Sequence, residues 1–192
     1  MKPMHLHGDT AWLLCLDVRT DYLTPEHPLF APAAVEALPA LHTLLGHARS
    51  TGWRVMHSVD ARRRAATVKG LEPRPDEAVF KRMGVSAFTS APLRARAEAD
   101  RPLAIFLAGF GLATSGLATL IVGAELGLSM ILVEDAFAAA AVGDRTADEI
   151  ARVVMAIAPA FGTLTTADVL DIDRARVVSL RRGHDDNDRL RE

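Results

Sequence analysis

The chain has 192 residues, of which 49% are hydrophobic and 24% charged, a balance typical of a single soluble globular domain. Its formal net charge of -2 argues against a nucleic-acid partner or a membrane surface, because both favour a strongly basic face. A single cysteine excludes an internal disulfide, and the first residues lack the apolar run of a secretory signal. We therefore expect a cytoplasmic protein with no nucleic-acid or membrane partner.

Strand-like and helix-like patterns alternate along the chain. Short apolar runs predict strands at 12–16, 53–59, 103–107 and 129–133, followed by a last strand and turn at 163–170. Apolar residues at helical spacing predict helices at 34–49, 115–126 and 146–160. The last of these helices has the sequence of a capping box, with Thr146 and Glu149 three residues apart.

This alternation is typical of βαβ units, whose strands form a parallel sheet covered on both faces. We predict the α/β class: a single-domain, three-layer, Rossmann-like fold with a mostly parallel central sheet. The domain is expected to cover residues 1–180, and the almost wholly polar segment 181–192 is expected to be a charged C-terminal tail.

Ligands of such sheets bind beyond the carboxyl ends of the strands. That rule places Asp17, Asp60, the turn at 109–115 and Asp135 along one edge of the predicted sheet. The segment 61–80 is rich in arginine and proline and has no clear periodicity, so we expect it to be a lid or binding loop.

Three segments could carry chemistry, although each also has a simpler interpretation. Asp17 ends a strand but could merely cap a turn, and Lys81 could be a solvated surface charge. The glycine-rich turn at 109–116 leads into a helix whose first N–H groups can stabilise negative charge. Thr114 or Ser115 could equally be an ordinary N-cap of that helix.

Taken together, these segments resemble the isochorismatase-like (cysteine hydrolase) family over most of the chain. Residues 17–22 stand where members of the family carry Asp-x-Gln-x-Asp-Phe, and Lys81 precedes a Ser-Ala-Phe segment at 86–88. Gly109 and Gly127 match two glycines that flank the family's nucleophile turn, and Ser115 then occupies the cysteine position. Residues 134–136 match the Asp-Ala that follows the next strand.

The resemblance implies a hydrolase that cleaves a small amide or related C–N bond. It assigns Asp17 as the base, Lys81 as its electrostatic partner and Ser115 as the nucleophile position. The turn that would receive the oxyanion contains Gly111, Leu112 and Thr114. The resemblance also implies a small-molecule substrate and a homodimer or homotetramer.

The residues expected to contact substrate lie near these motifs. They are Arg19, Tyr22, Asp60, Arg62 and Phe88. The arginines among them could bind a carboxylate through two parallel hydrogen bonds, or could be exposed charges on a loop.

No metal and no other cofactor is expected. Arg62 stands where metal-binding nicotinamidases of this family carry a histidine ligand. His57 is expected to be a packed or hydrogen-bonded core residue. Cys15 shares a strand face with Asp17, and we expect it to be a buried and inert thiol.

A serine at the nucleophile position leaves three explanations open, because an alcohol ionises far less readily than a thiol. Ser115 could be an engineered replacement of a cysteine, made to trap a substrate. The protein could be an isochorismatase-type vinyl-ether hydrolase, in which Asp17 acts as an acid and no thiol is needed. It could also be a catalytically inactive relative that binds a ligand or partner.

Overall fold

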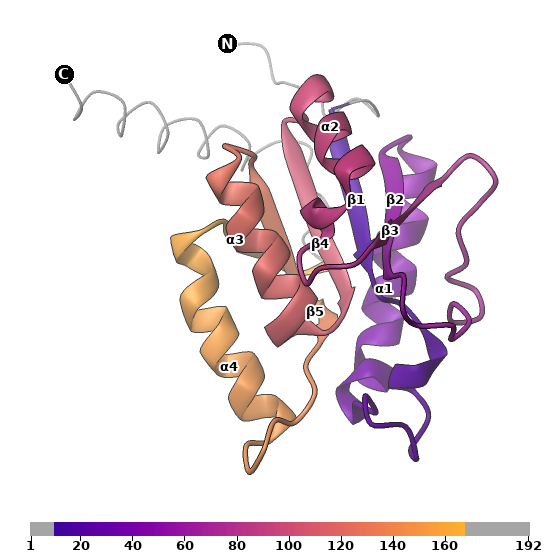
Figure 1. Ribbon diagram of the computed structural model, residues 1–192, viewed down its shortest axis with the longest axis vertical. Helices are drawn as coiled ribbons and strands as arrows, with labels where there is room; N and C mark the ends of the chain where they lie inside the picture. The colour runs from indigo at the N-terminus through magenta and orange to yellow at the C-terminus, as the bar shows by residue number, and fades with distance from the viewer. Residues whose placement is uncertain (1–9, 168–192) are drawn as a thin grey trace.

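The strand β1 (Ala11–Leu16) lies at the centre of the fold, and all six of its side chains are buried. Ala11, Leu13 and Cys15 pack into one apolar cluster, whereas the alternating residues 12, 14 and 16 pack into another on the opposite face. A strand that is apolar on both faces must be covered on both sides. The computed structural model, which describes residues 10–167, shows this arrangement (Figure 1).

Six parallel strands form one sheet in the order β3-β2-β1-β4-β5-β6. The five strands besides β1 are β2 (Arg54–Asp60), β3 (Ala78–Arg82), β4 (Ala104–Phe110), β5 (Met130–Ala138) and β6 (Thr163–Thr165). The predicted α/β class and parallel sheet are thus confirmed. The order reverses between β1 and β4, and this is the place where ligands of doubly wound sheets bind.

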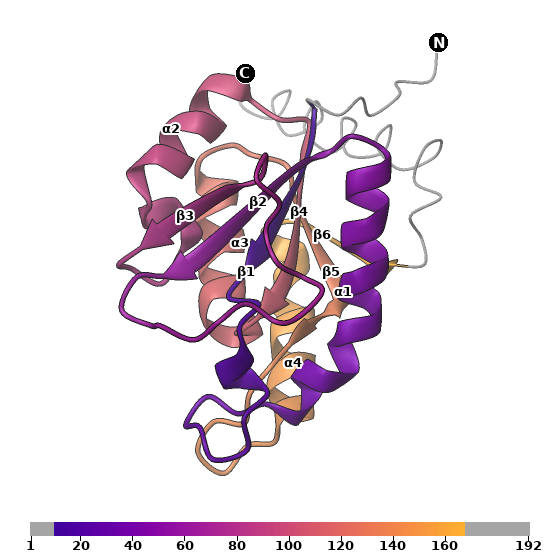
Figure 2. The same cartoon turned by 90° about the vertical axis from the view of Figure 1, so that its right-hand side faces the viewer.

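Helices cover both faces of this sheet and complete the three layers (Figure 2). The long helix α1 (Pro32–Ser50) packs on one face. The other face is covered by α2 (Ala91–Asp100), α3 (Leu117–Glu125) and α4 (Ala147–Ile157). The predicted capping box at the start of α4 is present, with both Thr146 and Glu149 bonded to backbone N–H groups.

Some elements differ from the prediction. The end of the predicted loop at 61–80 is the edge strand β3, and α2 was not predicted. An edge strand with exposed residues on both faces has no clear alternation of apolar and polar residues, so the sequence did not predict β3. The strand β5 extends beyond its predicted end, so Asp135 lies within it and accepts a bond from the Ala167 N–H at 2.8 Å.

The predicted tail at 181–192 and the end of the predicted element at 163–170 lie outside the described residues. Within residues 10–167, no helix is both long and apolar enough to cross a membrane.

The register of the sheet brings four strand ends together. Leu16 at the end of β1 is paired with Ser58 of β2 and with Gly109 of β4, and Asp60 of β2 is paired with Arg82 of β3. The residues that follow these pairs therefore meet at one edge of the sheet, as the sequence led us to expect for Asp17 and the turn after β4.

Candidate active site

Asp17 lies directly after β1 and is only 2% exposed. Its backbone has φ of 48°, in the left-handed region that a residue other than glycine rarely adopts. The Asp17 N–H is bonded to the Ser58 carbonyl at 3.0 Å, and this bond helps to hold the turn. Such a conformation costs on the order of 1–3 kcal/mol and is retained where the surroundings fix it. Here it turns the carboxylate toward the ends of β2, β3 and β4.

The cation that contacts Asp17 is Arg82, not Lys81. The Arg82 guanidinium donates through Nη1 to Asp17 Oδ1 at 3.1 Å and through Nη2 to Asp17 Oδ2. It also donates to the Val85 carbonyl at 3.0 Å, and its side chain is 4% exposed. Lys81 lies on the exposed side of β3, so the structure does not bring it to Asp17.

The turn after β4 approaches Asp17 because a glycine lets two strand ends come close together. Gly109 has φ of 133°, and a Cβ built on it would lie 2.1 Å from the Leu16 carbonyl oxygen. Any side chain at this position would push β4 away from the end of β1. With glycine there, the chain passes through Gly111 and into a π-helical turn, Leu112–Gly116, that leads into α3.

Ser115 lies on this turn and is 2% exposed. Its hydroxyl Oγ is 3.1 Å from Asp17 Oδ2, and it is also 3.4 Å from the Phe110 carbonyl oxygen. Since the hydroxyl has one proton, the shorter and charge-assisted bond to Asp17 is the stronger of the two. Hydrogen bonds thus connect Arg82 to Asp17 and Asp17 to Ser115.

Both oxygens of Asp17 accept hydrogen bonds. Oδ1 accepts from the Asp60 N–H and from Arg82, each at 3.1 Å, while Oδ2 accepts from Arg82 and Ser115. Four donors around one carboxyl group correspond to the acceptor-only role of an ionised carboxylate. Of the four donors, only the Ser115 hydroxyl offers a proton that Asp17 could accept in a reaction, since the guanidinium and the backbone N–H do not give theirs up.

The three turn residues that the sequence assigned to an oxyanion site have different surroundings. Gly111 has φ of 77°, and a Cβ built on it would lie 3.0 Å from the Ser115 Oγ and 3.0 Å from the Thr114 Oγ1. Leu112 is fully buried and packs in the cluster beneath α3. The Thr114 hydroxyl donates to the Gly111 carbonyl at 3.1 Å, so it stabilises the turn.

Arg19, predicted to contact substrate, instead anchors the loop that joins β2 to β3. Its guanidinium donates to the carbonyl oxygens of Asp60, Arg63 and Ala65 at 2.5–3.2 Å, and the residue is 7% exposed. With its donors directed at three backbone groups, Arg19 fixes the loop beside Asp17.

The remaining predicted contacts also have partners within the protein. Arg62 is exposed and forms two bonds to Asp60, at 2.9 and 2.6 Å, which hold the pKa of that carboxyl at about 2. Phe88 is 3% exposed and packs in the apolar cluster with α2 and α3. Tyr22 follows β1 in a short 3-10 turn and is 4% exposed, and Arg63, which the sequence did not single out, donates to its hydroxyl.

Comparison with known proteins identifies the family to which the chain belongs. The model of the isochorismatase domain matches residues 11–169, which is most of the chain. The chain belongs to the isochorismatase family. No curated protein matches it.

Solved structures of isochorismatase-family proteins share the fold. An isochorismatase from Pseudomonas putida is 25% identical, with a TM-score of 0.77 over 88% of this chain and 93% of that chain. A cysteine hydrolase from Pseudomonas syringae is 16% identical, with a TM-score of 0.76 over 88% and 93% of the two chains. An N-carbamoylsarcosine amidase from Thermoplasma acidophilum is 18% identical, with a TM-score of 0.65 over 83% and 97%.

A second polar cluster of this isochorismatase-family protein is formed by residues of α1, of β2 and of the loop that joins β2 to β3. His57 Nε2 is 3.0 Å from Glu77 Oε2, and Arg49 donates to both oxygens of Glu77 at 2.7 and 2.9 Å. Burial opposes ionisation of Glu77, but the bonds from Arg49, the Arg74 N–H and His57 hold its pKa at about 2. Burial lowers the pKa of His57, against the effect of Glu77.

These contacts agree with the interpretation of His57 as a hydrogen-bonded core residue. Burial, with the nearby charge of Glu77, raises the pKa of Cys15 to about 12. The Cys15 thiol therefore stays protonated near neutral pH, as expected of an inert side chain. Among residues 10–167, no group of three or more His, Cys, Asp or Glu side chains could hold a metal ion.

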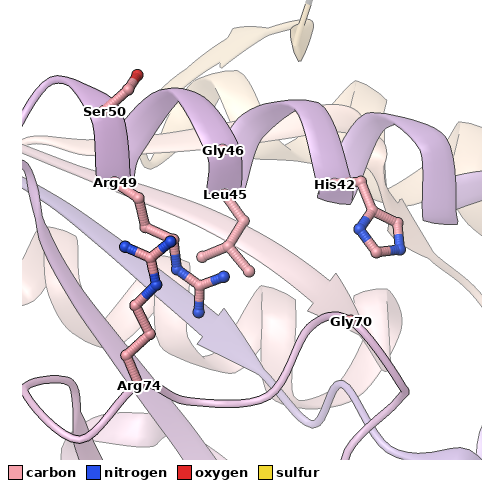
Figure 3. Close-up of a pocket in the computed structure, with 7 residues that line it drawn as sticks. All are labelled: His42, Leu45, Gly46, Arg49, Ser50, Gly70 and Arg74. Atoms are coloured by element: carbon pink, nitrogen blue, oxygen red, sulfur yellow. The ribbon is translucent and has the colours of Figure 1, made fainter.

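A surface hollow of about 350 Å³ lies between α1 and the loop, and the side chains of Arg49 and Arg74 face each other across it (Figure 3). Asp17, Arg82 and Ser115 do not line it. The hollow is thus separate from the candidate active site, which lies at the carboxyl ends of the strands.

Proposed function

We propose that this member of the isochorismatase family hydrolyses an amide or related C–N bond of a small molecule, with Ser115 as nucleophile and Asp17 as base. The observation that supports this best is the 3.1 Å bond from the Ser115 hydroxyl to Asp17 Oδ2. A nucleophile within hydrogen-bond reach of a base, itself held by a third group, is the usual arrangement for covalent catalysis. Arg82 is that third group.

The arrangement gives each residue a separate task. Asp17 accepts the Ser115 proton as Oγ attacks the carbonyl carbon, and can return it to the leaving nitrogen. Arg82 keeps its positive charge at any ordinary pH, so it holds the carboxylate in place and does not exchange protons. In the first half of the reaction the proton therefore passes from Ser115 through Asp17 to the leaving nitrogen. In the second half, a water molecule attacks the Ser115 ester and gives a proton to Asp17, which returns it to Ser115 Oγ as the acid product leaves.

Two further considerations favour C–N hydrolysis. One relative of the same fold is an N-carbamoylsarcosine amidase, and an amidase acts on an amide bond. Vinyl-ether hydrolysis, the alternative, requires Asp17 to carry the proton that it donates. Both oxygens of Asp17 accept hydrogen bonds from the Asp60 N–H, Arg82 and Ser115, so a protonated Asp17 would lose one of these bonds.

A substrate screen tests the proposal. The purified protein is assayed against simple amides, N-carbamoyl amino acids and isochorismate, with release of ammonia, or of the carbonyl product of vinyl-ether cleavage, as the readout. We expect hydrolysis of at least one amide or ureide, and a loss of at least about a thousandfold in Ser115→Ala and in Asp17→Asn. Ser50→Ala, on the exposed end of α1, is the control and should keep the full rate.

Two results would contradict the proposal. One is turnover of isochorismate with no turnover of any amide. The other is an amidase activity that Ser115→Ala retains, because the nucleophile would then be another group.

A further inference from the structure

The hydroxyl of Tyr22 lies beside the Ser115 hydroxyl, and Gly111 is the residue between them. A Cβ built on Gly111 would lie 2.9 Å from Tyr22 Oη and 3.0 Å from Ser115 Oγ. Both oxygens are therefore near one point, beside a glycine whose φ of 77° excludes most side chains. A small group bound to the Ser115 oxygen comes within reach of the Tyr22 hydroxyl.

The position of Tyr22 is fixed by its surroundings. The ring packs against Phe110 at the end of β4, with 5.4 Å between the ring centroids. The Arg63 guanidinium also lies over the ring, 4.7 Å from its centroid, and Arg63 Nε donates to Asp21 Oδ2 at 2.8 Å. A phenol held by two neighbours needs little reorganisation when charge develops beside it.

The bonding of the Tyr22 hydroxyl leaves its proton available. Oη accepts a hydrogen bond from Arg63 Nη1 at 3.3 Å. Within the described part of the chain, the phenol proton itself has no acceptor. A buried donor with no acceptor is costly unless a ligand supplies one.

The neutral form of the Tyr22 phenol, which can donate a hydrogen bond, is favoured by its surroundings. Burial raises the pKa of the phenol, and the negative charge of Asp17 raises it further, whereas the hydrogen bond and the charge of Arg63 lower it. The hydroxyl therefore keeps its proton through the neutral range and can donate a hydrogen bond there.

We infer that the Tyr22 hydroxyl donates a hydrogen bond to the substrate oxygen that becomes an oxyanion, and that Arg63 positions it. The inference rests on the proposed function. As Ser115 Oγ bonds to the carbonyl carbon, the Ser115 proton passes to Asp17 and the π electron pair of C=O moves onto oxygen. When C=O forms again, the C–N bond breaks and the nitrogen takes the proton from Asp17. A water molecule then attacks the Ser115 ester and gives a proton to Asp17; when C=O forms once more, the bond to Ser115 Oγ breaks and Oγ takes that proton. Tyr22 loses no proton in any of these steps.

This role narrows the class of substrate. The reacting group must carry a carbonyl oxygen that accepts a hydrogen bond, as an amide or a ureide does. The Arg63 guanidinium, which donates to Oη and lies over the ring, makes the Tyr22 hydroxyl a stronger donor to an anion than it would be without Arg63.

Replacing Tyr22 by phenylalanine tests the inference, because it removes the hydroxyl and keeps the ring that packs on Phe110. Loss of one oxyanion donor is expected to lower kcat about a hundredfold to a thousandfold, with little change in KM. Asp17 and Ser115 are unchanged in this variant, so any remaining activity should still be abolished by Ser115→Ala.

A thioamide substrate separates this role from a structural one. Sulfur accepts hydrogen bonds weakly, so the wild type should prefer the amide over the matching thioamide, and Tyr22→Phe should lose most of that preference. Arg63→Met should lower kcat less than Tyr22→Phe does. The double variant should be no slower than Tyr22→Phe, because Arg63 acts through the phenol.

The outcomes distinguish the inference from the function on which it rests. If no amide is hydrolysed, or if Ser115→Ala remains active, the proposed function fails and the inference fails with it. If Ser115→Ala is inactive but Tyr22→Phe keeps at least half of the wild-type kcat and an unchanged preference for oxygen over sulfur, only the role of Tyr22 is overturned.

Discussion

Replacing Arg82 by methionine should destabilise the protein strongly, because Asp17 would remain buried without its cation. The two side chains are 4% and 2% exposed, and two hydrogen bonds join them. Breaking a buried ion pair by removing one partner costs about 3–5 kcal/mol. In a domain of this size, that loss lowers Tm by roughly 6–20 °C.

The assay is chemical denaturation followed by circular dichroism, with a double-mutant cycle. Asp17→Asn in the Arg82→Met background removes the unpaired charge, so the double variant should be more stable than Arg82→Met alone. We expect a coupling energy of about 1–3 kcal/mol between the two sites.

Lys81→Met is the matched control, since Lys81 is the neighbouring residue of β3 and lies on its exposed side. It should change the free energy of unfolding by no more than about 0.5 kcal/mol. Equal effects of Lys81→Met and Arg82→Met, with no coupling to Asp17, would refute the assignment of Arg82 as the partner of Asp17.

Three further predictions concern the rest of the chain. The pKa of Glu77 is about 2, against an ordinary value of 4.5, so its stabilisation is complete above about pH 4.5 and is lost as the pH falls toward 2. Glu77→Gln should therefore flatten the dependence of Tm on pH between 5 and 2, and an unchanged slope would count against the network. Cys15 should react with a thiol reagent only after unfolding, as measured by absorbance, and rapid labelling of the folded protein would contradict its burial. Dialysis against a chelator should leave the hydrolysis rate unchanged, because His57 is bonded to Glu77 and Arg62 to Asp60; a loss restored by zinc would disprove this.

The sequence was sufficient to predict how Asp17 and Ser115 meet. Both follow short apolar runs, which the alternation with helical segments indicates to be buried strands, and parallel strands end at a common edge. The parallel arrangement of the central strands was predictable for the same reason, whereas β3 and α2 were not predicted. The central strands β1 and β4 are apolar on both faces, so their pattern is strong.

Arg82 could not be identified in this way, because it lies on a short edge strand. Lys81 and Arg82 are adjacent, and in a strand adjacent side chains point to opposite faces. A register shift of one residue therefore decides which cation reaches Asp17. The weak pattern of β3 does not fix that register from the sequence.

The roles of Arg19 and Arg63 depend on contacts between distant parts of the chain. Arg19 bonds to carbonyl groups more than 40 residues away, and Arg63 bonds to Asp21 and Tyr22 over a similar separation. An arginine in a loop can bind a substrate, a carboxylate or the backbone. Only the folded arrangement of the loop distinguishes these partners.

The most direct test of the proposed catalytic centre is intact-mass spectrometry of the protein after reaction with an activated acyl donor, p-nitrophenyl acetate. We expect one acetyl group per chain, which peptide mapping should place on Ser115. Ser115→Ala should carry none, Asp17→Asn should form the adduct much more slowly, and Ser115→Cys should form a thioester. A wild-type protein that forms no adduct while it hydrolyses amides, or an adduct that persists in Ser115→Ala, would contradict the assignment of Ser115 as the nucleophile.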